Sequence, residues 1–221
     1  MTSLRLPKRR RPDINPSRHL LPELIQLWLL RMLVLLDGIN STRSSISYEV
    51  QNLGPALGLG QALKAEMPEG EVQAHVQKQL VERLKVVEEQ AKNARPPEVL
   101  TRNVQRVADL IGLNPMEVRI IEFSVLVKAN HQLKMGAESL GNLDKSQLTQ
   151  ALSTVLDLPV PDIREALHPQ ARLAQSGLLT ISSGYSDTLD NKLNLLSDSL
   201  HEKLMDDDVQ PESWLQHLIY K

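Results

Sequence analysis

The chain has 221 residues, a formal net charge of −2 and 41% hydrophobic residues, enough to bury one large or two small cores. It contains no cysteine, which excludes disulfide bonds and thiolate metal sites and fits a reducing, cytoplasmic compartment. Aromatic residues make up only 3%, with Phe123 the single phenylalanine, so leucine, alanine and valine must form the core. This composition favours a mainly α-helical fold.

Residues 1–16 are expected to form a flexible basic arm. Such an arm can contact phosphates or an acidic partner, and a solvated tail is the alternative interpretation. The candidate contact residues are four consecutive basic side chains: Lys8, Arg9, Arg10 and Arg11.

A helical N-terminal region is predicted over 17–94, and its first helix, 20–36, is the most apolar segment of the chain. The run is shorter than the roughly 20 apolar residues of a membrane span. A charge such as Arg31 near its centre adds about 2.5–3.5 kcal/mol to the cost of insertion. We therefore expect no membrane span, and a helix that is covered either by the rest of the chain or by another subunit.

A long second helix is predicted over 70–93, after a loop-like stretch, 38–70, whose glycines match no phosphate-binding motif. Its apolar residues form a narrow stripe, which suits a helix that leans on a single neighbour or on another copy. The N-terminal region is therefore a candidate protein interface for a partner or for self-association, with these residues: Leu24, Trp28, Arg31, Leu35, Val76, Leu80 and Leu84.

The prolines at 96–97 mark the predicted boundary with a second domain, 97–205. A first helix is expected to end at Gly112, and the pair Asn114-Pro115 is typical of an N-cap followed by proline at the first helical position. The helix that starts there is predicted to reach residue 131. Residues 132–144 are interpreted as a turn region.

The stretch 145–183 predicts a helix, a turn, a second helix and a strand. Apolar spacing indicates a helix over 145–156, which Pro159 and Pro161 prevent from continuing. The second helix starts near Asp162, and Pro169 indicates a kink or a split. Gly177 suits a left-handed C-cap before a strand at 178–181 and a turn at 182–184. This order predicts a winged-helix-like domain with a small β-wing.

Leucines at four- and three-residue intervals from Leu189 to Leu204 predict a further amphipathic helix. A C-terminal helical tail is expected over 206–221, where three aspartates precede a short apolar segment. The six histidines show no i,i+3 or i,i+4 pair, so neither a helical metal site nor a cofactor is predicted.

A family resemblance rests on the segments NVQRVADLIGLNPMEVRIIEFSVLVKAN, VLDLPVPDIREAL and RLAQSGLL. They resemble a helical and winged-helix region that precedes the ATPase core in certain bacterial AAA-type ATPases, and the resemblance covers about residues 100–204. Walker A, Walker B and arginine-finger motifs are missing, so no nucleotide-binding residue can be carried over. The resemblance therefore implies the N-terminal recruiting or regulatory part of such an enzyme, or a stand-alone relative of it.

Two functions follow from these patterns. The first is a non-catalytic interaction module, since no nucleophile elbow, phosphate loop or paired-carboxylate pattern is present and no catalytic residue is expected in this chain alone. The second is a DNA-binding winged-helix regulator, in which the second helix of the unit would face the major groove. The side chains that would then contact nucleic acid are Arg164, His168 and Arg172.

Overall fold

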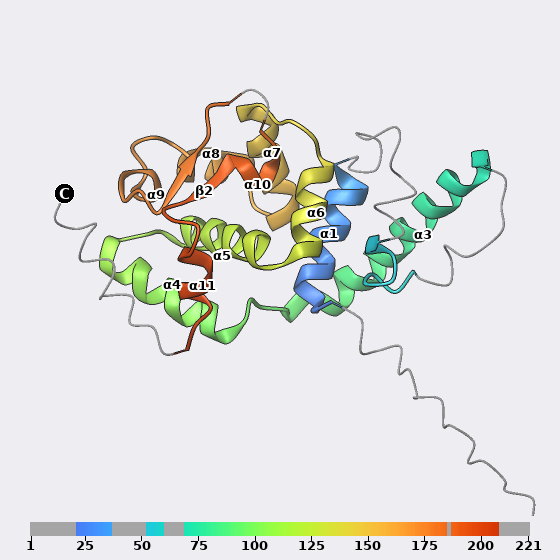
Figure 1. The fold of residues 1–221 in the computed structure, drawn as a ribbon, viewed down its shortest axis with the longest axis horizontal. Coiled ribbons are helices and arrows are strands. Elements are labelled where there is room, and N and C mark those ends of the chain that lie inside the picture. The colour runs from blue at the N-terminus through green and yellow to red at the C-terminus, as the bar shows by residue number, and fades with distance from the viewer. Residues whose placement is uncertain (1–20, 37–51, 60–68, 185–186, 208–221) are drawn as a thin grey trace, which may run out of the picture.

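The computed structural model describes residues 21–36, 52–59, 69–184 and 187–207, and within them the protein is mainly helical (Figure 1). Two short strands form a small antiparallel sheet. No helix in these ranges combines the length and the hydrophobicity that crossing a bilayer requires. The helices are α1 (Glu23–Leu35), α3 (Glu69–Gln90), η3 (Ala91–Asn93), α4 (Glu98–Ile111), α5 (Pro115–Ala129), α6 (His131–Ser139), α7 (Lys145–Leu156), α8 (Val160–Ala166), α9 (Arg172–Gln175), α10 (Leu189–Lys192) and α11 (Leu200–Leu204).

Helix α1 confirms the predicted apolar helix and lies inside the molecule rather than on its surface. It packs against α3 on one side and against α6 and α7 on the other (Figure 1). The ring of Trp28 meets that of Phe123 on α5 edge to face, with centroids 5.2 Å apart. A single hydrophobic core therefore runs from α1 through to α11, and it is continuous across the boundary that the prolines at 96–97 suggested.

Local capping signals place α4 and α5 as the sequence predicts. Gly112 adopts a left-handed conformation (φ 76°) and ends α4. The Asn114 side chain accepts hydrogen bonds from the backbone N–H groups of Met116 and Glu117, and the Glu117 side chain accepts one from the backbone N–H of Asn114. This reciprocal capping box fixes the start of α5.

The turn region predicted at 132–144 is wrong over 132–139, where α6 lies, and correct over 140–144, which belongs to no helix or strand. Asn130 caps this helix by accepting a hydrogen bond from the N–H of Leu133. Gly136 lies in its middle, a residue that lowers intrinsic helix propensity. A Cβ atom at this position would clash with the Leu29 side chain of α1. Helix propensity alone argues against a glycine inside α6. The close approach of α1 explains why one is found there.

The helix–turn–helix–strand order of 145–183 is confirmed. A capping box between Asp144 and Gln147 starts α7. Pro159 precedes α8, and the split expected at Pro169 separates α8 from α9. Gly177 has a φ of 70° and precedes strand β1 (Leu179–Ile181). The winged-helix assignment itself stays a prediction.

The continuous helix predicted from Leu189 to Leu204 is wrong. That stretch forms α10, then strand β2 (Leu193–Leu195), then α11. β2 pairs antiparallel with β1, with Thr180 opposite Asn194. The predicted spacing used Leu189, Leu193, Leu196, Leu200 and Leu204; four of these five are buried, so the pattern identified core residues, but Leu196 remains 41% exposed. Strand pairing outweighs the helical conformation that the leucine spacing predicts, because the backbone N–H and C=O groups of β1 need hydrogen-bonding partners.

Glu122 on α5 is a buried carboxyl group with a pKa raised above its ordinary value of 4.5. Burial is the main cause, and it outweighs the hydrogen bond with Thr101 and the charges of Arg119 and Arg95, which act in the opposite direction. Because the folded state binds this proton more tightly than the unfolded chain does, the resulting stabilisation is complete below pH 4.5 and is lost as the pH rises through the raised pKa.

We therefore expect Glu122→Gln to raise the free energy of unfolding at neutral pH, because glutamine keeps an oxygen for Thr101 and carries no charge to desolvate. The gain should shrink as the pH falls towards 4.5, where the wild-type carboxyl group is itself protonated. Urea denaturation at the two pH values measures both effects. A variant that is less stable than wild type at neutral pH would show that the charged form makes a net favourable contribution.

Candidate interaction site

The N-terminal interface residues predicted from sequence are mostly core residues of this chain. Helices α1 and α3 pack against each other, so the apolar stripe of α3 is buried within this chain and needs no second copy of the protein to cover it. Leu35 is the exception among them, with 52% of its surface exposed. An interface on this face that needed the other apolar side chains would require α1 and α3 to separate. The side chains buried in this way are Leu24, Trp28, Val76, Leu80 and Leu84.

Arg31 joins three helices. Its guanidinium donates to the backbone carbonyl of Val155 at 3.0 Å and lies 3.5 Å from the Glu88 carboxylate and 3.6 Å from that of Asp157. Arg119 donates to the carbonyl of Leu156 at the same helix end, at 3.3 Å. Two cations at the C-terminus of α7 complement the helix dipole, so Arg31 fastens α1 to α7 and α3.

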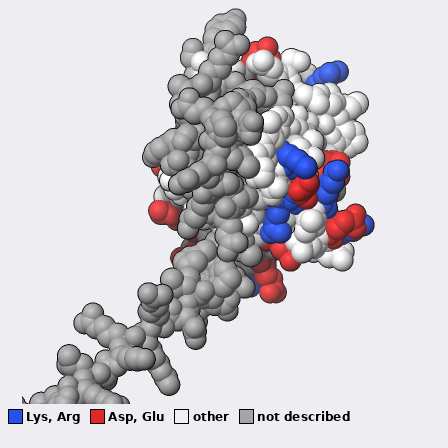
Figure 2. All heavy atoms as spheres, turned by 90° about the vertical axis from the view of Figure 1, so that its right-hand side faces the viewer, with Lys and Arg blue, Asp and Glu red and all other residues white. Residues whose placement is uncertain are grey.

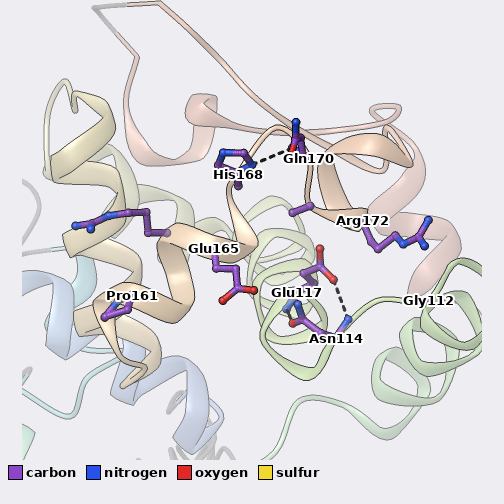
Figure 3. A pocket seen from close by; sticks show the side chains of 10 residues that line it. Gly112, Asn114, Glu117, Pro161, Glu165, His168, Gln170 and Arg172 are labelled. Atoms are coloured by element: carbon purple, nitrogen blue, oxygen red, sulfur yellow. Dashed lines mark hydrogen bonds between the residues drawn. The ribbon is translucent and has the colours of Figure 1, made fainter.

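The predicted nucleic-acid residues fall into two sets. Lys8, Arg9, Arg10 and Arg11 lie outside the described residues. The other three are among the residues that line a groove of about 680 Å³ between the α8–α9 segment and the turn that joins α4 to α5 (Figure 3). We call this the α8–α9 groove. Its lining residues are Gly112, Asn114, Glu117, Pro161, Arg164, Glu165, His168, Gln170, Ala171 and Arg172.

Glu117 holds the two sides of the α8–α9 groove together. Its side chain is buried, with 1% of the residue exposed. One carboxylate oxygen accepts from the backbone N–H of Asn114 and the other from the N–H of Leu173, both at 2.8 Å. Each donor lies at the start of a helix, α5 or α9, where a carboxylate is favoured. Glu117 therefore fixes the spacing between the two walls.

Sequence reasoning missed this role. The capping-box pattern of Asn114 and Glu117 could have indicated the local half of the arrangement. The bond to Leu173 joins residues 56 positions apart, so only the tertiary fold creates it.

The basic side chains of the α8–α9 groove are accessible and lack acidic partners in the described part of the chain. Arg164, His168 and Arg172 are exposed, and none of them forms an ion pair with a described residue. The N–H of Gln170 donates to Nδ1 of His168 at 3.2 Å, which orients the ring. Figure 3 shows Glu117 and Asn114 between Glu165 and Arg172 in this view. Glu165 is an exposed carboxylate in the lining and Glu117 is a buried one, so the groove carries mixed charge, with two arginines and two glutamates.

The β1–β2 hairpin adds no accessible cation in its described residues. Lys192, its basic residue, is only 4% exposed and donates to the backbone carbonyls of Ser182 and Gly184. On the face drawn in Figure 2, most of the charged side chains that are described form one cluster in which basic and acidic groups lie next to one another. Among their described residues, neither the hairpin nor this face provides the row of cations with which proteins hold a nucleic-acid backbone.

The described residues contain no group of three or more histidine, aspartate or glutamate side chains placed to hold a metal ion. Comparison with protein-family models, with curated proteins and with solved structures finds no match for the chain. The chemistry of the α8–α9 groove therefore carries the functional argument.

Proposed function

We propose that this protein is a non-catalytic interaction module that binds an acidic segment of a partner protein in the α8–α9 groove. The observation that supports it most is that Arg164, His168 and Arg172 all line one groove, are exposed and form no ion pair with a described residue. Arginine forks suit carboxylates because they can donate two parallel hydrogen bonds. Partner recruitment is the role that the resemblance of residues 100–204 to the N-terminal region of AAA-type ATPases implies for such a module.

Charge distribution favours a polypeptide over nucleic acid as the ligand. Glu165 lies among the basic residues, and Asp162 lies on the same short helix. A peptide of mixed sequence can avoid or use these carboxylates, whereas the evenly charged backbone of a duplex cannot. The hairpin, which would be the wing, has its Lys192 engaged with its own carbonyl groups.

A DNA-binding winged helix is the second candidate, and one observation favours it. Helices α7 and α8 are separated by a short turn through Asp157 and Pro159, and exposed Arg164 lies on α8, the position of a recognition helix. Both candidate functions are compatible with a winged-helix unit, which is itself part of the proposal.

Binding of two labelled probes separates the candidates: an acidic peptide of glutamates and serines with one central lysine, and a mixed-sequence DNA duplex, each at low and moderate salt. We expect saturable binding of the acidic peptide, weakened about tenfold by the double variant Arg164→Ala/Arg172→Ala, because two charge-assisted hydrogen bonds are lost. The matched control is Lys78→Ala/Lys85→Ala, which removes the same charge from exposed positions on α3 and should change binding little.

Firm duplex binding that falls steeply with salt and needs Arg164 and Arg172 would instead support a DNA reader. Duplex binding that is lost only when residues 1–16 are removed would indicate an electrostatic arm. If the acidic peptide binds the double variant and the wild type equally, the α8–α9 groove is not the binding site and the proposal fails.

A further inference from the structure

Helix α7 ends without the glycine that most often closes a helix in the left-handed conformation. Its C-cap residue, Asp157, has a φ of 55°, and it is the only residue other than glycine with a positive φ in the described part of the chain. Helix α4, by contrast, ends at Gly112. A Cβ atom makes the left-handed conformation less favourable, so the end of α7 depends more on contacts from elsewhere in the chain.

Two arginines from distant helices supply these contacts. The last four carbonyl groups of an α-helix have no partner within the helix. Arg31 of α1 donates to the carbonyl of Val155 at 3.0 Å, and Arg119 of α5 donates to that of Leu156 at 3.3 Å. The Arg31 side chain is only 12% exposed and also lies 3.6 Å from the Asp157 carboxylate. The end of α7 is therefore stabilised by a largely buried cation that α1 contributes.

The turn after α7 leads directly into the α8–α9 groove. The Ser153 hydroxyl donates to the carbonyl of Leu158 at 2.6 Å, which ties the turn to the last residues of α7. Pro159 and Pro161 follow, and their rings restrict the backbone φ, so the connection to α8 is stiff. Helix α8 then contributes three lining residues to the groove: Pro161, Arg164 and Glu165. The position of this wall therefore depends on how the end of α7 is held.

We propose that Arg31 is a positioning residue for the α8–α9 groove, and that its contact with the end of α7 holds the α8 wall in the ligand-binding position. This inference rests on the proposed function and assigns part of the ligand affinity to a residue outside the groove. Without the guanidinium, the Val155 carbonyl loses its donor and Asp157 is free to relax to the negative φ that residues with a Cβ atom prefer. The stiff connection would then shift α8, and with it Arg164.

Hydrogen exchange of the ligand-free chain tests the positioning role without any ligand. Arg31→Met removes the donors and keeps much of the side-chain length. We expect the amides of Ile163 and Leu167, which form hydrogen bonds at α8, to exchange about tenfold faster. The matched control is Arg83→Met, because Arg83 donates to Gln26 of α1 and not to α7. It should leave the α8 amides unchanged.

A core amide separates local opening of α8 from unfolding of the whole chain. Val107 of α4 is 2% exposed and belongs to the hydrophobic core. Its exchange reports loss of the core in each variant, so the α8 rates are compared relative to it. The excess acceleration at α8 should appear in Arg31→Met alone.

A second substitution distinguishes positioning from a general loss of stability. Glycine adopts a positive φ readily, so it should hold the turn without help from α1. We expect the double variant Arg31→Met/Asp157→Gly to regain α8 exchange rates close to those of the wild type, although the bond to Val155 is still absent. Loss of the Asp157 carboxylate itself should matter little, because that side chain is 83% exposed.

Affinity for the acidic peptide with the central lysine is the second readout. Arg31→Met should bind it at least about fivefold more weakly than the wild type, the lower end of typical coupling between distant sites. Arg83→Met should bind it as the wild type does, and the Asp157→Gly substitution should restore most of the affinity that Arg31→Met loses.

Equal α8 exchange in Arg31→Met and Arg83→Met, or a double variant that glycine does not rescue, would overturn the inference. Unchanged peptide affinity in Arg31→Met would overturn it as well. If the wild-type chain itself binds no acidic peptide, the proposed function fails, and the exchange rates still decide whether Arg31 positions α8. The two failures are therefore distinguishable.

Discussion

Replacing Trp28 by alanine should lower the free energy of unfolding by about 3–5 kcal/mol, the range seen for large aromatic residues removed from protein cores. Trp28 is 2% exposed and packs edge to face against Phe123. The change would leave a cavity where α1 meets α5 and would remove the favourable ring contact. Chemical denaturation of the monomeric chain, followed by circular dichroism, measures the effect.

Leu35→Ala is the matched control on the same helix, because its side chain is half exposed. We expect a change within about 0.5 kcal/mol, as for surface substitutions in general. A Trp28→Ala variant as stable as the wild-type monomer would show that α1 is not part of the core. It would restore the sequence-based expectation that this helix meets another subunit.

Replacing Glu117 by alanine should cost roughly 2–4 kcal/mol, because two buried or partly buried N–H donors lose a charged acceptor. These donors belong to Asn114 and Leu173, and the second lies 56 residues away in the chain. Beyond the loss of stability, α9 should lose its attachment to α5. We expect faster hydrogen exchange at Leu173 and weaker binding of the acidic peptide in the α8–α9 groove.

Glu165→Ala is the control for this prediction, since it removes an exposed carboxylate from the same lining. It should leave stability nearly unchanged, and loss of its repulsion should keep or improve acidic-peptide binding. If Glu117→Ala and Glu165→Ala have the same small effect on stability, Glu117 does not hold α9 to the start of α5.

The elements that the sequence predicts correctly are those whose signals are local. A helix end depends on a few neighbouring residues, so Gly112, Asn114 and Pro159 identify the boundaries of α4, α5 and α8 without knowledge of the fold. The exposed residues Arg164, His168 and Arg172 could also be picked out, because they lie on the polar side of a short amphipathic segment.

The wrong predictions share a different origin. Residues 193–195 have leucine spacing that fits a helix, yet they form β2 because β1 needs a backbone partner. Gly136 weakens the helical signal of α6, yet α6 forms because its glycine lets α1 approach closely. In both cases a contact between distant segments outweighs a preference worth about 1 kcal/mol or less per residue.

By itself, the sequence determined that the chain is mainly helical, where several helices begin or end, and which side chains mostly avoid water. The sequence left open whether the apolar faces of α1 and α3 pack against each other or against a partner. The hydrophobic effect is non-directional, so an apolar pattern predicts burial but does not say against what. The tertiary structure decided that they pack within one core. It also decided, through Glu117, that the residues of α8 and α9 form one groove, since a hydrogen bond across 56 residues exists only once the chain has folded.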